Sequence, residues 1–221
     1  MLLRANIKAC LEFAKGHRDW TVKDWKRVIW SDETKINRFQ SDGFSWYWKR
    51  EENQLQPHHI KQTVKHGGGS IMIWGCMTAE GPGYMCKIDG IMDQHLYRTI
   101  LEDDLIQTIK FYQLDTEKVI FQHDNDPKHK AKSVQNWLTT QDFQVLEWPA
   151  QSPDLNPIEN LWYNLKRMLN QYESSPKRVL ELWQRIVVYY TGIPSLNFYF
   201  SIEPPSNYKW GKRLFLFCSA K

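Results

Sequence analysis

From residue 118 onward the chain alternates between short apolar runs and segments with helical spacing, and this alternation strongly limits the folds it can adopt. We predict strands over 118–123 and 144–148, and helices over 131–140, 158–169 and 176–189. Parallel strands need a long crossover, usually a helix, whereas antiparallel strands can be joined by a tight turn. The second half of the chain therefore predicts strands added in parallel to one sheet.

The first half of the chain favours strands. The patterns predict them over 27–34, 44–49 and 70–77, followed by a helix over 95–112, and the apolar spacing before residue 20 permits another helix. Three consecutive strands can pair as hairpins. The expected fold is therefore α/β, with a mixed five-stranded sheet flanked by helices on both faces.

Two glycine-rich stretches are predicted to be turns. Gly67-Gly68-Gly69 precedes a strand and no Gly-Lys-Ser/Thr follows it, so a phosphate-binding loop is the weaker interpretation. Gly81-Pro82-Gly83 combines the two residue types that most often mark a turn.

Composition sets broad limits on the function. The 221 residues suit one large domain, and 42% hydrophobic residues with 14% aromatics suffice for a packed core. A net charge of +4 is compatible with a polyanionic partner without requiring one. The four cysteines form no CxxC pair, which favours thiols in a reducing compartment over a zinc site. No apolar run approaches the ~20 residues of a membrane span and no signal peptide is evident, so we expect a soluble intracellular protein with no membrane partner.

Three acidic residues occupy positions that suit a metal site. Asp32 and Asp124 each end an apolar run, and Glu159 lies in the first turn of a predicted helix. Two carboxylates at neighbouring strand ends and a third from a helix make an all-oxygen site of the kind that holds hard divalent cations. Paired cations in such sites catalyse in-line attack at phosphate, so the pattern predicts a phosphodiester-processing enzyme.

Each acid also has an interpretation that involves no metal. Asp32 and Asp124 are common turn residues at strand exits, and Asp126 is a rival to Asp124 as a ligand. Glu159 lies three residues after the helix cap Asn156, where an acid suits the helix dipole.

Three side chains near the acids in the sequence are weaker candidates for a metal site. Strand alternation places Glu33 on the opposite face from Asp32, so the two cannot share one site. His123 and His129 could form a zinc pair by residue type, but no third soft ligand lies nearby in the sequence.

Taken together, these motifs resemble a known family. The matching strings are WSDET (30–34), TVKHGGGSIMIWGCMT (63–78), QHDNDPKH (122–129) and WPAQSPDLNPIENLW (148–162). They are similar to the catalytic domain of mariner-superfamily DDE transposases, and 34 residues separate Asp124 from Glu159, as in the branch with glutamate as third acid. The resemblance covers about residues 10–187.

The resemblance implies a ribonuclease H-like fold in which Asp32, Asp124 and Glu159 are the catalytic and metal-binding residues. It also implies two Mg²⁺ or Mn²⁺ ions, with transposon ends and target DNA as partners. A homodimer or higher assembly in a synaptic complex, and a nuclear location, follow from the same resemblance. The implied activity is metal-dependent DNA cleavage at transposon ends followed by strand transfer.

This interpretation divides the chain into three parts: an N-terminal remnant or linker without a helix-turn-helix module (1–26), the catalytic domain (27–188) and an atypical tail (189–221). Because the recognition modules and the usual ending are missing, a truncated or inactive copy is one expectation. A non-catalytic DNA-binding or interaction remnant of a transposon is the main alternative, and a host nuclease of the same fold is a weaker one. Basic residues near the acids are expected to face phosphates: Lys128, His129, Lys130, Lys132, Lys166 and Arg167.

Overall fold

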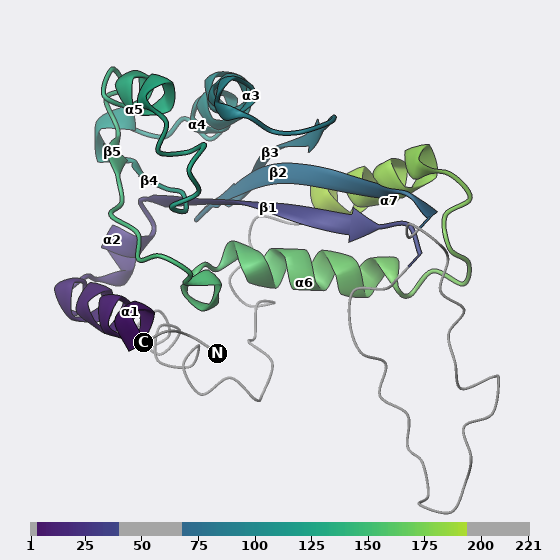
Figure 1. Ribbon diagram of the computed structural model, residues 1–221, viewed down its shortest axis with the longest axis horizontal. Helices are drawn as coiled ribbons and strands as arrows, with labels where there is room; N and C mark the ends of the chain where they lie inside the picture. Colours follow the sequence, from purple (N-terminus) through teal and green to yellow (C-terminus); the bar gives the residue numbers. More distant parts are fainter. Residues whose placement is uncertain (1–3, 40–67, 194–221) are drawn as a thin grey trace, which may run out of the picture.

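A computed structural model describes residues 4–39 and 68–193, and its centre is a mixed five-stranded sheet (Figure 1). The strands are β1 (Val28–Asn37), β2 (Ser70–Thr78), β3 (Gly81–Ile88), β4 (Ile120–Gln122) and β5 (Gln144–Val145), in the order β3-β2-β1-β4-β5. The pairs β1–β2 and β2–β3 are antiparallel, whereas β1–β4 and β4–β5 are parallel. The predicted mixed sheet, with parallel addition in the second half, is confirmed.

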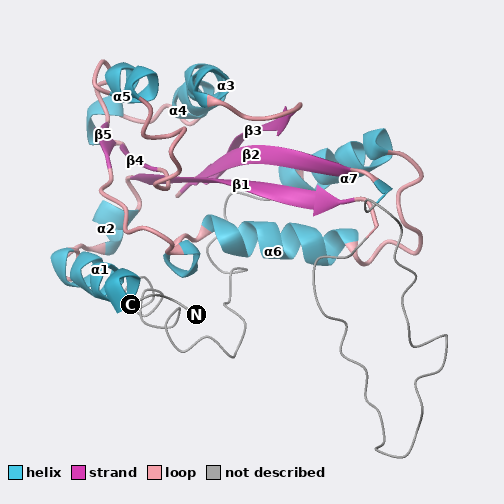
Figure 2. Cartoon of the chain, in the orientation of Figure 1, coloured by secondary structure: helices cyan, strands magenta, loops and turns pink. Residues whose placement is uncertain are grey.

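Helices cover both faces of the sheet (Figure 2). They are α1 (Arg4–Gly16), α2 (Val22–Trp25), α3 (Gln94–Ile100), α4 (Ile106–Phe111), α5 (Lys132–Leu138), α6 (Ile158–Leu169) and α7 (Val179–Thr191). Short 3₁₀ turns occur at Thr116–Lys118 and Pro153–Leu155. Within the described ranges, no helix has the length and apolar character needed to cross a membrane.

Strand β3 differs from the sequence-based expectation. Gly81-Pro82-Gly83 begins this strand, and the turn lies one step earlier at Ala79–Glu80. Pro82 is tolerated because β3 is an edge strand, where a missing N–H need not break a ladder. A Cβ at Gly83 would lie 2.5 Å from Sγ of Cys76, so glycine is required here for close packing. The strand predicted over 44–49 lies outside the described residues.

The helix predicted over 95–112 is one helical segment with an irregular centre. Helices α3 and α4 are joined by a π-helical turn, Leu101–Leu105. Asp93 caps the start of α3, its carboxylate accepting from the backbone N–H groups of His95 and Leu96. The predicted extent is therefore right, and the internal π turn was not foreseen.

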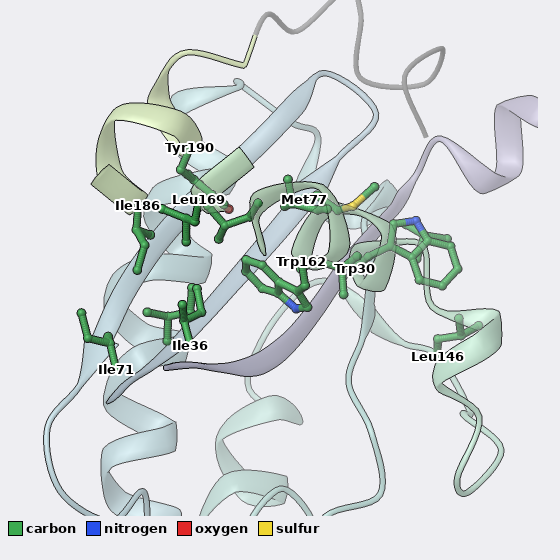
Figure 3. Packing of buried hydrophobic residues seen from close by; sticks show 14 of the residues in the cluster. Trp30, Ile36, Ile71, Met77, Leu146, Trp162, Leu169, Ile186 and Tyr190 are labelled. Carbon is green, nitrogen blue, oxygen red and sulfur yellow. The ribbon is translucent and has the colours of Figure 1, made fainter. Parts of the chain in front are cut away.

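The sheet separates two hydrophobic clusters. On one face α6 and α7 pack against β1 and β2 through Trp30, Ile36, Met77, Trp162, Ile186 and Tyr190, among others (Figure 3). On the other face α3, α4 and α5 pack against the sheet through Ile29, Trp74, Leu105, Phe121 and Val134. Both faces of the sheet are thus buried, as expected for a strand–helix alternation.

Both ends of the described chain belong to this packing. Phe13 of α1 and Trp25 of α2 are members of the α6-side cluster, so the expected linker over 1–26 contributes to the core. Helix α7 continues to Thr191, and Tyr190 is buried with its hydroxyl donating to the backbone oxygen of Cys76 at 2.8 Å. The expected tail boundary at residue 189 therefore falls inside a packed helix.

Candidate active site

Asp32 lies on the central strand β1, directed toward α6. Val28 and Trp30 belong to the α6-side cluster, whereas Ile29 belongs to the opposite one, so alternation places Asp32 on the α6 side and Glu33 on the other. Strand β1 continues to Asn37, which keeps this alternation intact through both acids. The two carboxylates therefore lie on opposite faces of β1, as strand alternation predicts.

A glycine opposite Asp32 sets how closely α6 approaches the sheet. Asp32 pairs with Gly75 of β2, and a Cβ at Gly75 would lie 2.8 Å from Cη2 of Trp162. Trp162 is fully buried, so α6 rests on the sheet at this glycine. The close approach brings the first turn of α6, which carries Glu159, to the strand that carries Asp32.

The carboxyl groups of Asp32 and Glu159 lie close enough for the charge of Glu159 to act on Asp32. Burial, followed by the negative charge of Glu159, raises the pKa of Asp32 to about 8. Glu33 raises this pKa further, while a backbone N–H that donates to Asp32 lowers it. The site thus brings two half-buried carboxyls so close that a proton or a cation is needed to offset their mutual repulsion.

Asp124 follows β4 at the level of Asp32. The parallel pairing of β1 and β4 ends at Trp30 and Gln122, and each aspartate comes two residues after its member of that pair. The register therefore places the two aspartates at the same level along neighbouring strands. The expectation that both acids follow the end of a strand is right for Asp124 and wrong for Asp32, because pairing with β2 carries β1 on to Asn37.

His129 bridges Asp124 and Glu33. Its Nδ1 lies 2.6 Å from Oδ1 of Asp124, and its Nε2 lies 3.2 Å from Oε1 of Glu33. Burial alone would lower the pKa of His129, but the two carboxylates raise it to about 9. In return, the His129 contact and the backbone N–H of Asp126 lower the pKa of Asp124 against the effect of burial.

Tyr97 packs against both histidines of this region. Its ring stacks on His129 with centroids 3.9 Å apart, and its hydroxyl lies 3.2 Å from Nδ1 of His123. Burial, then the positive charge of His129, lowers the pKa of His123 to about 4. His123 is therefore a neutral, packed side chain at neutral pH.

Asp126 is engaged elsewhere. Its carboxylate accepts from the backbone N–H of Lys128 and pairs with Nζ of Lys128 at 2.7 Å. This local turn gives Asp126 a structural role beside Asp124.

The donor set suits a hard divalent cation, although the described residues hold no pre-assembled cluster. Within those residues, no group of three or more His, Cys, Asp or Glu side chains is close enough to form a metal site. The structure brings Asp32 and Glu159 together, and it holds Asp124 just beyond the end of the neighbouring strand β4 against His129. Carboxylate oxygens are the ligands that Mg²⁺ and Mn²⁺ prefer, so the residue types fit these ions.

The basic residues expected to face phosphates differ in exposure. Lys130, Lys132 and Arg167 are exposed, and Lys128 and Lys166 are half-buried. His129 does not fit the expectation, because only 2% of it is exposed and both ring nitrogens face carboxylates.

Sequence reasoning missed three residues that shape this site. Glu33 was recognised only as facing away from Asp32, and its contact with His129 depends on a turn that no pattern predicts. Ser31 and Gln122 are buried polar residues inside apolar runs, and that contrast was the available signal.

Comparisons with known proteins define the family. Residues 27–182 match the family model described as DDE superfamily endonuclease. The chain is 42% identical over 170 residues to the transposase of transposable element Tcb1 of Caenorhabditis briggsae, covering 77% of this chain and 62% of that protein. It is 41% identical over 174 residues to the Tc1 transposase of Caenorhabditis elegans, covering 78% and 62% respectively. The chain spans less than two thirds of the length of these two relatives.

Solved structures agree on the fold. A Mos1 transposase paired-end complex with the left transposon end superposes with a TM-score of 0.73 at 18% identity, covering 99% of this chain and 62% of that one. The Mos1 catalytic domain with raltegravir and Mg gives 0.65 at 19% identity, covering 99% and 96%. The ribonuclease H-like fold implied by the sequence motifs is thus confirmed.

The chain belongs to the DDE superfamily endonuclease family. Within it, the similarity to Tc1-group transposases identifies a catalytic domain of the Tc1/mariner type, as the motifs predict.

Proposed function

We propose that this chain carries out the chemical steps of DNA transposition, metal-dependent cleavage at transposon ends and strand transfer into target DNA. The observation that carries the proposal is the Asp32–Glu159 carboxyl pair, built from a strand and a helix more than 120 residues apart in sequence. The family membership supports it, since the relatives are transposases.

Asp32, Asp124 and Glu159 would hold the divalent cations, two in number, with Mg²⁺ or Mn²⁺ as the fitting ions. Of the related structures, one Mos1 catalytic domain contains Mg and a paired-end complex contains Mn. When bound, such ions stabilise the charge that develops at the reacting phosphate and activate the attacking oxygen.

The chain's own residues prepare the site for these ions. The contact with His129 helps keep Asp124 ionised at neutral pH, because it lowers the pKa of that carboxyl. His129 in turn is held from the far side by Glu33. The site therefore needs no histidine base; His129 supports a ligand.

DNA binding is assigned to the exposed cations around the acids. Lys130, Lys132 and Arg167 are exposed and Lys128 and Lys166 are half-buried, so all five side chains are accessible to a phosphate backbone. Such contacts would bind DNA with little sequence preference and a steep dependence on salt, because they release counterions without reading bases. Transposon ends, target DNA, a homodimeric synaptic complex and a nuclear location are part of the proposal by analogy with the family.

A non-catalytic DNA-binding role is the second candidate, and it predicts that the acids are dispensable. The test is nicking of supercoiled plasmid by the full chain in Mn²⁺, with Asp32→Asn, Glu159→Gln and Asp154→Asn compared. Asp154 is exposed on the loop before α6, which makes it a matched acidic control. We expect the first two variants to lose cleavage while DNA binding persists; equal cleavage by all four proteins would contradict the proposal.

A further inference from the structure

A buried polar residue precedes each of the three acids in the sequence. Ser31 is 3% exposed, Gln122 is not exposed at all and Asn156 is 6% exposed. They precede their acids by one, two and three residues respectively. Since buried polar groups are unfavourable unless they are hydrogen-bonded, their shared position calls for a structural account.

Ser31 is bonded to the strand that leads to Asp124. Its backbone N–H donates to Oε1 of Gln122 at 3.1 Å, and its hydroxyl donates to the backbone oxygen of Gln122 at 2.8 Å. These two bonds connect β1 to β4 at the last registered pair before the acids.

Ser31 is also bonded to the segment that leads to Glu159. Nδ2 of Asn156 donates to the backbone oxygen of Ser31 at 3.1 Å. Oδ1 of the same side chain accepts from the backbone N–H of Ile158 at 3.3 Å, which caps the start of α6. One amide therefore connects the residue before Asp32 to the residue before Glu159.

We propose that Ser31, Gln122 and Asn156 are positioning residues that fix the three acids relative to one another for cation binding. This inference rests on the proposed function, because it assumes that the acids bind the ions. Ser31 is the junction, since its backbone and hydroxyl groups bond to both other segments. Groups bonded behind metal-binding carboxylates orient them and tune affinity.

The partners of Gln122 favour positioning over simple stabilisation. Its Nε2 is buried and has no hydrogen-bond partner among the described residues, so the amide carries an unsatisfied donor. An unsatisfied buried donor is destabilising, but an apolar side chain in its place would leave the buried backbone N–H of Ser31 without its partner. The feature that distinguishes the amide is the Oε1 bond to the backbone of Ser31.

The test measures Mn²⁺ affinity of the full chain by electron paramagnetic resonance, without DNA and without turnover. Asn156→Ser retains a hydroxyl that can cap α6 but cannot reach Ser31, and Ser31→Ala removes the hydroxyl bond to Gln122. Thr108→Val is the matched control, because Thr108 is a fully buried, hydrogen-bonded hydroxyl in the α4 layer. Unfolding by urea reports the stability of each variant.

We expect Asn156→Ser and Ser31→Ala to weaken Mn²⁺ binding roughly 10- to 100-fold, the range found for residues that support metal ligands. Thr108→Val should leave the Mn²⁺ affinity unchanged, although its loss of stability should be comparable to that of the two test variants. The inference is wrong if Ser31→Ala binds Mn²⁺ as tightly as the wild type does, and if Asn156→Ser, provided that it folds, does so too. The Asp32→Asn variant separates the positioning inference from the proposed function. If the wild type and Asp32→Asn bind Mn²⁺ equally, the proposed function itself fails.

Discussion

Nδ1 of His129 lies 2.6 Å from Oδ1 of Asp124, and the same ring reaches Glu33 through its other nitrogen. A single buried imidazole thus connects the carboxylate after β4 to the central strand β1. The contact lowers the pKa of Asp124 against the opposing effect of its partial burial. It also makes the metal-free protein sensitive to pH in a defined direction.

We expect the stability contributed by His129 to fall as the pH rises in metal-free buffer. The pKa of His129 is about 9 in the folded protein, above the ordinary value of 6.5. Because the folded protein binds this proton more tightly than the unfolded chain does, the protonated imidazole stabilises the fold. This contribution is complete below about pH 6.5 and disappears as the pH passes 9. It is on the order of 3 kcal/mol at its largest. Urea unfolding from pH 6 to 9.5 should show a steeper decline in wild type than in His129→Gln, since Asp32, with a pKa of about 8, lowers the stability of both proteins over part of this range. Parallel curves would contradict the assignment.

Gly75 is predicted to control the distance between α6 and the sheet. Gly75→Ala introduces a Cβ 2.8 Å from Trp162, so the helix must shift, and we expect a loss of about 1–3 kcal/mol in the free energy of unfolding. Gly16→Ala is the control, because a Cβ there meets no atom within 4 Å. Urea denaturation compares the two; equal stabilities would show that the helix is not seated on Gly75.

Tyr190 is predicted to anchor α7. Tyr190→Phe removes the bond to the backbone oxygen of Cys76 and should lower stability by about 1 kcal/mol. Ending the chain after residue 188 removes the whole buried ring and should be far more harmful than ending it after residue 193. The measurement is thermal unfolding of both truncated chains. Indistinguishable unfolding midpoints would support the domain boundary at residue 189 that the sequence predicts.

Phe13 tests whether α1 is part of the catalytic domain. Its ring contacts Trp25 and Trp148 with centroids 6.5 and 5.2 Å apart. Phe13→Ala should lower stability by about 3 kcal/mol or more, whereas Ile7→Ala, at a residue 51% exposed, should change it little. Similar small effects for both variants would mean that α1 is only loosely attached.

The sequence was most informative where one strong local pattern decides the structure. Helix α6 was predicted to within a residue because its apolar stripe is long and its start carries Asn156 and Pro157. Strand β3 was missed because Pro82 is tolerated at the edge of the sheet and Gly83 is required by packing against Thr108, and no local pattern encodes either condition. The convergence of Asp32 and Glu159 was expected from family resemblance, whereas the Glu33–His129–Asp124 bridge depends on the turn around Pro127 and was not foreseen.

The measurement that tests the central claim most directly is a crystal structure of the full chain soaked with Mn²⁺, with anomalous diffraction collected at the manganese edge. The account predicts an anomalous peak within bonding distance of carboxylate oxygens from both Asp32 and Glu159, with Asp124 turned toward the same site. That peak should be absent from the Asp32→Asn variant. Manganese bound only elsewhere, or bound equally in the variant, would contradict the assignment of these acids as the metal site.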